Sequence, residues 1–301
     1  MTRERIIFDL FGHERLVQTL CSSLNAVPGK IDTRRFPDGE TFLRLDTPVR
    51  GREVALVADL SRPDCKFLAL AYAVMTAREL GASRVGLVAP YLPYMRQDKR
   101  FHDGEAITST QFAHLISGLI DWLVTVDPHL HRRASLAEIY SSPALALHAA
   151  PLIAQWIGDN VDNPVLIGPD SESEQWVAEV ADIAGAPHLV LDKVRRGDRD
   201  VSVSLPDPAA LGHRTPVLVD DIISTARTMI AAIAHLKALR SAPPVCVGVH
   251  AVFCGSAYDE LLSAGAARVV TCNSIPHRSN EIDIAPVLAA GVQQAVNKGI
   301  P

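Results

Sequence analysis

The chain has 301 residues, of which 48% are hydrophobic, and its formal net charge is −5. This length allows one large or two ordinary α/β domains with an ample core. The sequence contains no apolar run of about eighteen residues, no signal peptide and no strongly basic patch. We therefore expect no membrane span, no secretion and no binding to nucleic acid.

The cysteines are odd in number, scattered, and never spaced as a C-x-x-C pair: Cys21, Cys65, Cys246, Cys254 and Cys272. This pattern is typical of reduced core thiols rather than of a zinc site or a disulfide framework. It indicates a cytoplasmic protein.

Short, valine-rich runs of strand character alternate with amphipathic stretches along the chain. The predicted strands are Val54–Ala58, Val85–Ala89, Leu123–Val126, Val165–Ile167, Leu189–Leu191, Val217–Val219, Val245–Val249 and Val269–Thr271. The predicted helices include Phe67–Leu80, Ser173–Ala184 and Met229–Leu239. This alternation predicts βαβ units and mostly parallel sheets.

A weak internal repeat divides the chain into two similar halves, 1–148 and 149–301. The order of strand, turn, helix and strand over residues 54–89 recurs over residues 217–249. The sequence therefore predicts two α/β domains, each a mainly parallel sheet flanked by helices. In the first copy, Pro63 stands in the turn and lacks an N–H, so we do not expect that turn to bind phosphate.

A turn near the start of the chain, Arg35-Phe36-Pro37-Asp38-Gly39-Glu40, places an aromatic ring in a polar setting. An exposed Phe36 could stack on a purine, while Asp38 and Glu40 accept hydrogen bonds from an amine or from ribose hydroxyls. The alternative is an ordinary Pro-Asp-Gly turn with a tucked phenylalanine.

Arg96 and Gln97 follow the predicted strand Val85–Ala89, in the kind of loop where open α/β sheets bind ligands. Arg96 could clamp a polyphosphate, although a solvated basic loop is the alternative. After the next predicted strand come His129 and His131, which are either loop histidines or part of a metal site.

Lys193 and Arg195 follow the predicted strand Leu189–Leu191 and lead into a charged stretch, Gly197-Asp198-Arg199-Asp200. Mobile cations that close over a reacting phosphoryl group would stabilise its charge and exclude water. A surface loop held by ion pairs is the alternative.

The most informative segment is Val217-Leu-Val-Asp-Asp-Ile-Ile-Ser-Thr-Ala-Arg-Thr228. A strand ends in the acids Asp220 and Asp221, and a turn rich in hydroxyl groups leads into a helix from about Met229. Backbone N–H groups and the helix N-terminus attract an anion, while carboxylates accept hydrogen bonds from sugar hydroxyls or orient a Mg²⁺-bound water. The pattern indicates a sugar-phosphate site; a capped helix with acids there by chance is the alternative.

This segment resembles the ribose-5-phosphate loop of type I phosphoribosyltransferases and of the ribose-phosphate pyrophosphokinases. Other segments resemble the second family and occur in its order: 36–40 its adenine-binding turn, 94–99 its second ATP segment, 126–129 and 168–170 its magnesium segments, and 192–196 the start of its catalytic loop. The resemblance implies two domains like those of type I phosphoribosyltransferases. It also implies the transfer of pyrophosphate from ATP to ribose 5-phosphate, giving phosphoribosyl pyrophosphate and AMP.

The resemblance assigns roles to individual residues and implies Mg²⁺ as cofactor and a homo-oligomer as the assembly. The implied ATP-binding residues are Phe36, Asp38, Gly39, Glu40, Arg96 and Gln97. The implied ribose-5-phosphate residues are Asp220, Asp221, Ser224, Thr225, Ala226, Arg227 and Thr228. Lys193 and Arg195 are the implied catalytic cations, and His129 and Asp170 the implied metal residues.

The chain departs from the family at the residues that follow two of these sites. Ser171-Glu172-Ser173-Glu174 follows Asp170 where the family has small residues, and it resembles the start of a helix. Ala226-Arg227 stands where glycines are usual, so a positive φ there would be costly. A type I phosphoribosyltransferase and a non-catalytic regulatory relative remain alternatives.

Overall fold

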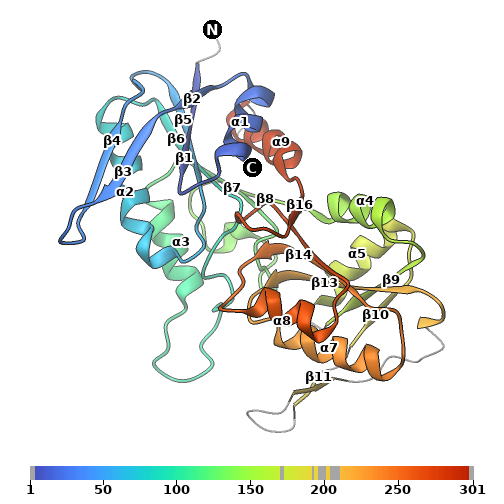
Figure 1. Ribbon diagram of the computed structural model, residues 1–301. Coiled ribbons are helices and arrows are strands. Elements are labelled where there is room, and N and C mark those ends of the chain that lie inside the picture. Colours follow the sequence, from blue (N-terminus) through green and yellow to red (C-terminus); the bar gives the residue numbers. More distant parts are fainter. Residues whose placement is uncertain (1–3, 170–172, 192, 196–200, 204–210, 298–301) are drawn as a thin grey trace. The chain divides into compact units, whose positions relative to one another are not determined.

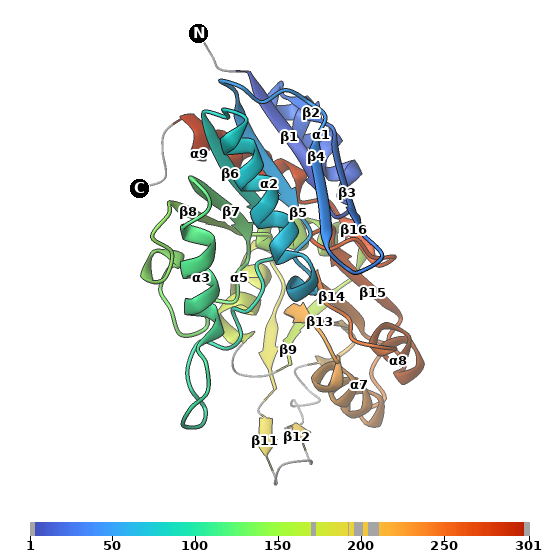
Figure 2. The same ribbon diagram turned by 90° about the vertical axis from the view of Figure 1, so that its left-hand side faces the viewer.

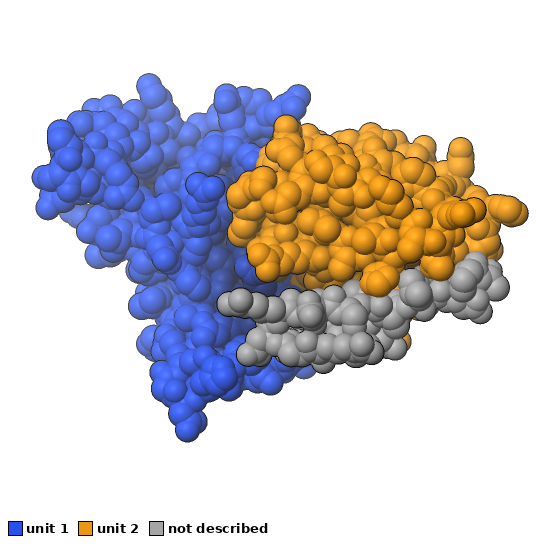
Figure 3. Space-filling model, turned by 60° about the horizontal axis from the view of Figure 1, so that its bottom comes forward, with its two compact units in different colours: residues 1–148, 274–276, 285–301 blue, residues 149–273, 277–284 orange. Residues whose placement is uncertain are grey.

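The computed structural model describes residues 4–169, 173–191, 193–195, 201–203 and 211–297, and the chain divides into two compact units. Unit 1 comprises 1–148, 274–276 and 285–301, and unit 2 comprises 149–273 and 277–284 (Figure 3). The expected division into 1–148 and 149–301 therefore omits two later segments that belong to unit 1, 274–276 and 285–301. The chain returns to unit 1 through its last helix, α9 (Ala285–Asn297).

Unit 1 is built on a six-stranded parallel sheet with the order β2-β1-β5-β6-β7-β8 (Figure 1). The strands are β1 (Arg5–Leu10), β2 (Val27–Gly29), β5 (Glu53–Ala58), β6 (Arg84–Ala89), β7 (Trp122–Val126) and β8 (Ala144–Leu147). The helices are α1 (Glu14–Leu24), α2 (Phe67–Glu79) and α3 (Thr108–Ser117), with short 3₁₀ helices at Pro63–Cys65 and Leu136–Glu138. A separate antiparallel hairpin joins β3 (Ile31–Arg35) to β4 (Thr41–Leu45).

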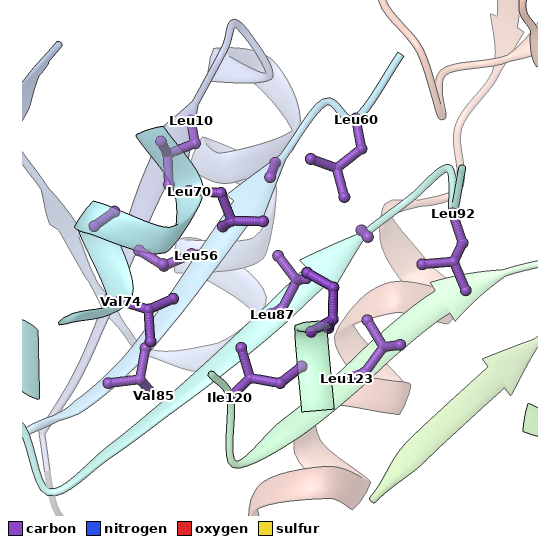
Figure 4. Packing of buried hydrophobic residues seen from close by; sticks show 14 of the residues in the cluster. Leu10, Leu56, Leu60, Leu70, Val74, Val85, Leu87, Leu92, Ile120 and Leu123 are labelled. Atoms are coloured by element: carbon purple, nitrogen blue, oxygen red, sulfur yellow. The ribbon is translucent and has the colours of Figure 1, made fainter. Parts of the chain in front are cut away.

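Helices cover both faces of this sheet: α2 and α3 lie on one face and α1 and α9 on the other (Figure 2). Every residue of β5 is buried, as expected of a central parallel strand with helices on either side. On the α2 face, Leu56 and Leu87 from the sheet pack with Leu70 and Val74 from α2 (Figure 4). The dense core fixes the ends of the strands, and the candidate site residues follow those ends.

Unit 2 repeats the same strand order, β10-β9-β13-β14-β15-β16, again with all strands parallel. These are β9 (Pro164–Gly168), β10 (His188–Val190), β13 (Thr215–Ile223), β14 (Val245–Ala251), β15 (Arg268–Cys272) and β16 (Asn280–Ile282). Its helices are α4 (Ala150–Asn160), α5 (Glu174–Ala184), α7 (Arg227–Ala238) and α8 (Ala257–Ala264). The expected architecture of two similar α/β units is confirmed.

Three local expectations need correction. The strand predicted at Val217–Val219 extends from Thr215 to Ile223, so the acidic pair lies inside the strand. The helix expected from about Met229 begins at Arg227. All five cysteines are free, but Cys65 and Cys254 are exposed rather than in the core. Among the described residues, no helix has the length and apolar character that crossing a membrane requires.

Candidate functional site

The end of β13 in unit 2 presents the two acids that the sequence singled out. Asp220 and Asp221 are both partly exposed, and the Asp221 N–H donates to Oδ1 of Asp220 over 3.0 Å. Asp220 lies beside Gly248 of β14, where a Cβ would come within 2.7 Å of the Ile223 side chain. Gly248 thus lets the two strands pack closely beside the acidic pair. Gly248 was not predicted as a site residue, although an isolated glycine in a strand often marks such a close approach.

The turn after β13 leads directly into α7, and its backbone is arranged like that of an anion-binding site. Ser224 is partly exposed and Thr225 exposed, and Ala226 is buried with a φ of 57°. Within the described residues, no side chain caps the first turn of α7. Its backbone N–H groups and the positive end of the helix dipole are therefore suited to an anionic ligand. Arg227 and Thr228, which are exposed and partly exposed, begin this helix.

Ala226 adopts the left-handed conformation that was expected to be costly for a residue other than glycine. A Cβ in this region raises the energy by about 1–2 kcal/mol. In unit 1, Arg62 has a φ of 53° in the matching turn before α2. The repeated units therefore share this backbone geometry as well as the strand order.

Cys254, in the loop after β14, fixes the turn and was not predicted as a site residue. Its N–H donates to the Ser224 carbonyl over 3.2 Å, and its Sγ lies 3.3 Å from the Ser224 hydroxyl. The two residues are 30 positions apart. No motif connects them in sequence, because only the parallel pairing of β13 and β14 brings them together.

The matching turn of unit 1 is closed by an ion pair. Nζ of Lys66 lies 2.5 Å from Oδ2 of Asp59, and both side chains are largely buried. Asp59 also accepts hydrogen bonds from the N–H and the hydroxyl of Ser61, both over 2.9 Å. The lysine thus neutralises the acid that corresponds to the acidic pair of unit 2. This gives a second physical reason, beyond Pro63, not to expect phosphate there.

Phe36 lies at the tip of the β3–β4 hairpin and is 40% exposed. The Gly39 N–H donates to the Phe36 carbonyl over 2.9 Å, and Gly39 has a φ of 93°, so the Pro-Asp-Gly tip forms a regular turn. The Phe36 ring packs edge-on against Phe42, with ring centroids 6.0 Å apart, and the Arg34 guanidinium lies over the Phe36 ring, 5.2 Å from its centroid. Asp38 accepts from the Glu40 N–H over 3.1 Å, and both acids are exposed.

Arg96 and Gln97 lie in the loop after β6, where Arg96 is exposed. Gln97 makes two structural hydrogen bonds. Its side-chain Oε1 accepts a hydrogen bond from the Thr108 hydroxyl over 3.2 Å, and its backbone carbonyl accepts one from the Ser109 N–H over 3.3 Å. Gln97 therefore holds this loop against the start of α3, and of the two Arg96 is the more accessible.

The turn that precedes α2 connects the hairpin to this loop. Arg35 donates to the Cys65 carbonyl over 2.8 Å, and the Tyr94 hydroxyl donates to Asp64. Burial and the Asp64 carboxylate together raise the pKa of Tyr94 to about 12. Both expected ATP segments thus contact the 3₁₀ turn 63–65.

The loop after β7 carries His129, which is partly exposed, with its ring centroid 6.0 Å from that of His131. Asp98 receives a hydrogen bond of 2.9 Å from Arg132 and so joins this loop to the one that contains Arg96. The described residues contain no cluster of three or more His, Cys, Asp or Glu side chains that could hold a metal ion. Asp170, the other expected metal residue, lies outside the described residues.

Lys193 and Arg195 lie in β11 (Lys193–Arg195), which pairs with β12 (Val201–Val203) as an antiparallel ribbon. The structure describes their backbone only. Residues 197–200, which were expected to be mobile, lie outside the described residues.

Comparisons with known proteins identify matches along the chain. Residues 5–119 match the family model for the N-terminal domain of ribose phosphate pyrophosphokinase, and residues 135–286 match the phosphoribosyl transferase domain. A ribose-phosphate pyrophosphokinase of Methanothermobacter thermautotrophicus is 34% identical, with 94% of this chain and 98% of the relative covered. One from Sulfolobus acidocaldarius is 32% identical, with coverages of 91% and 93%. In fold, the chain is similar to the phosphoribosylpyrophosphate synthetase of Mycobacterium smegmatis, with a TM-score of 0.85, 24% identity, and 99% of this chain and 100% of that chain covered.

Proposed function

Since the chain belongs to the ribose-phosphate pyrophosphokinase family, we propose that it transfers the diphosphate group of ATP to the 1-hydroxyl of ribose 5-phosphate, giving phosphoribosyl pyrophosphate and AMP. The observation that carries this proposal is the acidic pair in the last residues of β13, which is followed by a turn and by a helix start that no side chain caps among the described residues. A helix start of this kind suits a phosphate, and the carboxylates suit the neighbouring sugar hydroxyls.

In unit 2, the substrate would be ribose 5-phosphate. Its phosphate would accept hydrogen bonds from the backbone of residues 224–228 and from the hydroxyls of Ser224, Thr225 and Thr228. Asp220 and Asp221 would accept hydrogen bonds from the ribose hydroxyls. Arg227 adds a positive charge at the start of α7, and Ala226 contributes its N–H.

In unit 1, the ligand would be ATP. The exposed ring of Phe36 would stack on adenine, with Asp38, Gly39 and Glu40 beside the base or its ribose. Arg96 would contact the polyphosphate, and Gln97 would hold the Arg96 loop on α3 through its bonds to Thr108 and Ser109.

The chemical step forms one bond and breaks one. The O1 oxygen of the sugar attacks the β-phosphorus of ATP, the bond from that phosphorus to the α,β-bridging oxygen breaks, and AMP leaves with the bridging oxygen. The hydroxyl proton passes to solvent. Lys193 and Arg195 would stabilise the charge on the transferring group, since such reactions depend on positioning and electrostatics rather than on a covalent nucleophile.

Mg²⁺ fits this proposal as an ion that binds mainly through the nucleotide. Mg²⁺ keeps several waters and often takes only one or two protein carboxylates in addition to phosphate oxygens, so a cluster of three protein ligands is not required. Asp220 and Asp221 are partly exposed and offer oxygen donors, whereas the imidazole of His129 is a poor ligand for this ion. When bound, Mg²⁺ would neutralise part of the polyphosphate charge. We also propose a cytoplasmic homo-oligomer.

Incubation with ATP, Mg²⁺ and ribose 5-phosphate, followed by ³¹P NMR, tests the proposal. It predicts equal amounts of AMP and phosphoribosyl pyrophosphate, and neither product when ribose 5-phosphate is omitted. A type I phosphoribosyltransferase would instead consume phosphoribosyl pyrophosphate and a nucleobase without ATP. A regulatory relative would give no turnover with either substrate pair.

A further inference from the structure

Three half-buried rings of unit 2 pack together next to the residue that holds the sugar-phosphate turn. Phe253 lies in the loop between β14 and α8, Tyr258 in α8, and His277 in the loop between β15 and β16. The ring centroids of Phe253 and His277 are 4.7 Å apart, and the Tyr258 centroid lies 5.1 Å from that of His277 and 5.5 Å from that of Phe253. Each ring therefore contacts the other two, and we call these three residues the ring cluster.

The ring cluster is joined to the turn through a single step along the backbone. Phe253 directly precedes Cys254, whose N–H donates to the Ser224 carbonyl and whose thiol lies 3.3 Å from the Ser224 hydroxyl. Strand β14 ends at Ala251, so Phe253 lies beyond the sheet and its ring contacts fix its side chain. A shift of the Phe253 ring would therefore move Cys254 and, with it, the Ser224 hydroxyl.

A chain of hydrogen bonds fixes the protonation of His277. The Ser279 N–H donates to Nδ1 of His277 over 3.2 Å, and Oγ of Ser279 lies 2.8 Å from the same nitrogen. A backbone N–H can only donate, so Nδ1 carries no proton and the neutral ring has its proton on Nε2. Oγ of Ser279 lies 2.7 Å from Oγ1 of Thr271, which accepts from Nδ2 of Asn280 over 3.0 Å. Every group is satisfied when each hydroxyl donates in the direction of Nδ1.

A proton on Nδ1 would disrupt this arrangement, because the Nδ1–H and the Ser279 N–H would be two donors facing each other. The charged groups near the ring act in opposite directions. Burial and Arg278 on the same loop lower the pKa of His277, whereas Asp259 of α8 raises it, and the net effect is a lowered pKa. Arg278 is paired with Asp259 and lies over the Tyr258 ring, 4.2 Å from its centroid. The ring cluster is thus built for a neutral histidine.

We infer that His277 is a positioning residue for the binding of ribose 5-phosphate, and that it acts in its neutral form through Phe253 and Cys254. This inference rests on the proposed function of the turn. The neutral ring packs on Phe253, which keeps Cys254 beside the turn. When Nδ1 takes a proton, the ring loses its hydrogen bonds, the support of Phe253 weakens, and the turn binds the phosphate less tightly. The affinity for ribose 5-phosphate should therefore contain a contribution that is lost as the pH falls through the lowered pKa of His277.

Isothermal titration of the full-length chain with each substrate tests the contact. His277→Ala should raise the Kd for ribose 5-phosphate about 2- to 10-fold, the contribution typical of one aromatic pair, and leave that for ATP unchanged. His277→Ala combined with Cys254→Ala should cost less than the product of the two single effects, because both act through one contact. His188→Ala is the matched control, since His188 is exposed at the start of β10 in the same unit.

The outcomes of this titration separate the inference from the proposed function. A wild type that does not bind ribose 5-phosphate would refute the proposed function, and the inference with it. A wild type that binds ribose 5-phosphate, together with a His277→Ala protein of equal affinity, would refute the inference alone. Equal losses for both substrates in His277→Ala would do the same, because they would show a general effect on the fold.

The pH profile distinguishes positioning by the neutral ring from a purely structural role. His277→Phe keeps a ring against Phe253 without a titrating group, and His277→Asn keeps an acceptor for the Ser279 N–H without the ring. At about pH 8, His277→Phe should bind ribose 5-phosphate almost as tightly as the wild type, and His277→Asn should bind it more weakly.

Between about pH 7.5 and pH 5, the Kd of the wild type for ribose 5-phosphate should rise at least about threefold more than that of either variant. Ionisation of the sugar phosphate itself, with a second pKa of about 6, affects the three proteins alike and cancels in this comparison. Parallel profiles for the wild type and both variants would overturn the inference.

Discussion

The thiol of Cys254 lies 3.3 Å from the hydroxyl of Ser224, and the Cys254 N–H donates to the Ser224 carbonyl. The loop after β14 thus holds the turn that we assign to the sugar phosphate. Both residues lie just outside the strands β13 and β14. Their contact orients the Ser224 hydroxyl, which would donate a hydrogen bond to the phosphate. Removal of the thiol should therefore affect the binding of one substrate only.

Cys254→Ala should weaken the binding of ribose 5-phosphate by about 0.5–1.5 kcal/mol, the usual net contribution of a hydrogen bond. Cys254→Ser, which keeps a donor and acceptor, should remain close to the wild type. Isothermal titration of both variants with ribose 5-phosphate and with ATP makes the comparison. Equal losses for the two ligands would mean that Cys254 stabilises the fold rather than the turn.

Thr228→Ala should weaken the binding of ribose 5-phosphate by about 1–3 kcal/mol, because a hydrogen bond to a charged phosphate is stronger than one to a neutral group. Ser256→Ala, which removes a hydroxyl at the start of α8 in the same unit, is the control and should leave this affinity unchanged. Unchanged sugar-phosphate affinity in Thr228→Ala would show that the turn does not bind the phosphate.

Asp221→Asn should lower turnover while ATP binding stays nearly intact.

Phe36→Ala should raise the KM for ATP and leave that for ribose 5-phosphate unchanged. Stacking of a base on an aromatic ring contributes about 1–3 kcal/mol, and the exposed ring contributes little to the core. Steady-state kinetics with each substrate varied in turn gives both constants. A parallel rise of both KM values would indicate that Phe36 supports the hairpin instead.

Lys193→Ala should lower kcat by about 10²–10³-fold with little change in KM, by analogy with the loss of one preorganised donor in the transition state. Arg195→Ala should behave similarly, and the double variant should lose less than the product of both effects, because the two cations act on one charge. Lys237→Ala, near the end of α7, is the control cation and should retain activity. Near-normal AMP release by Lys193→Ala would contradict the proposed role.

The stability of unit 1 should fall as the pH drops below the ordinary pKa of histidine. His13 is buried, and desolvation lowers its pKa despite the nearby Asp59 and Asp9. Below about pH 6.5 the unfolded chain therefore binds a proton that the folded chain resists, and the unfolding free energy declines with pH until the lowered pKa is passed. His13→Asn should show a shallower decline in urea unfolding followed by circular dichroism. Identical pH profiles for both proteins would exclude His13 as the source.

Much of the fold was predictable because buried parallel strands leave short valine-rich runs and their helices leave a regular apolar period. The repeat of strand, turn and helix also predicted two similar units. The return of α9 to unit 1 was not predictable, because an apolar helix face carries no information about which sheet it covers. Residues Asp220 to Ile223 show a related limit of prediction from sequence. The two acids suggested that the strand had already ended, whereas pairing with β14 continues it to Ile223.

The candidate site was predictable where a motif is local and not where contacts cross the fold. Residues 220–228 form one continuous segment, so their pattern was readable. Cys254 reaches Ser224 only through the adjacency of β13 and β14, and Lys66 reaches Asp59 only because the turn of unit 1 folds back on itself. Neither contact corresponds to a recognisable spacing of residues in the sequence.

The most direct test of the proposed reaction is to follow the α,β-bridging oxygen of ATP. ATP labelled with ¹⁸O at that position is incubated with ribose 5-phosphate and Mg²⁺, and the products are analysed by mass spectrometry. Attack of the sugar hydroxyl on the β-phosphorus predicts that all of the label appears in AMP and none in phosphoribosyl pyrophosphate. Label in pyrophosphate or in the sugar product, or no turnover that depends on ribose 5-phosphate, would contradict the proposal.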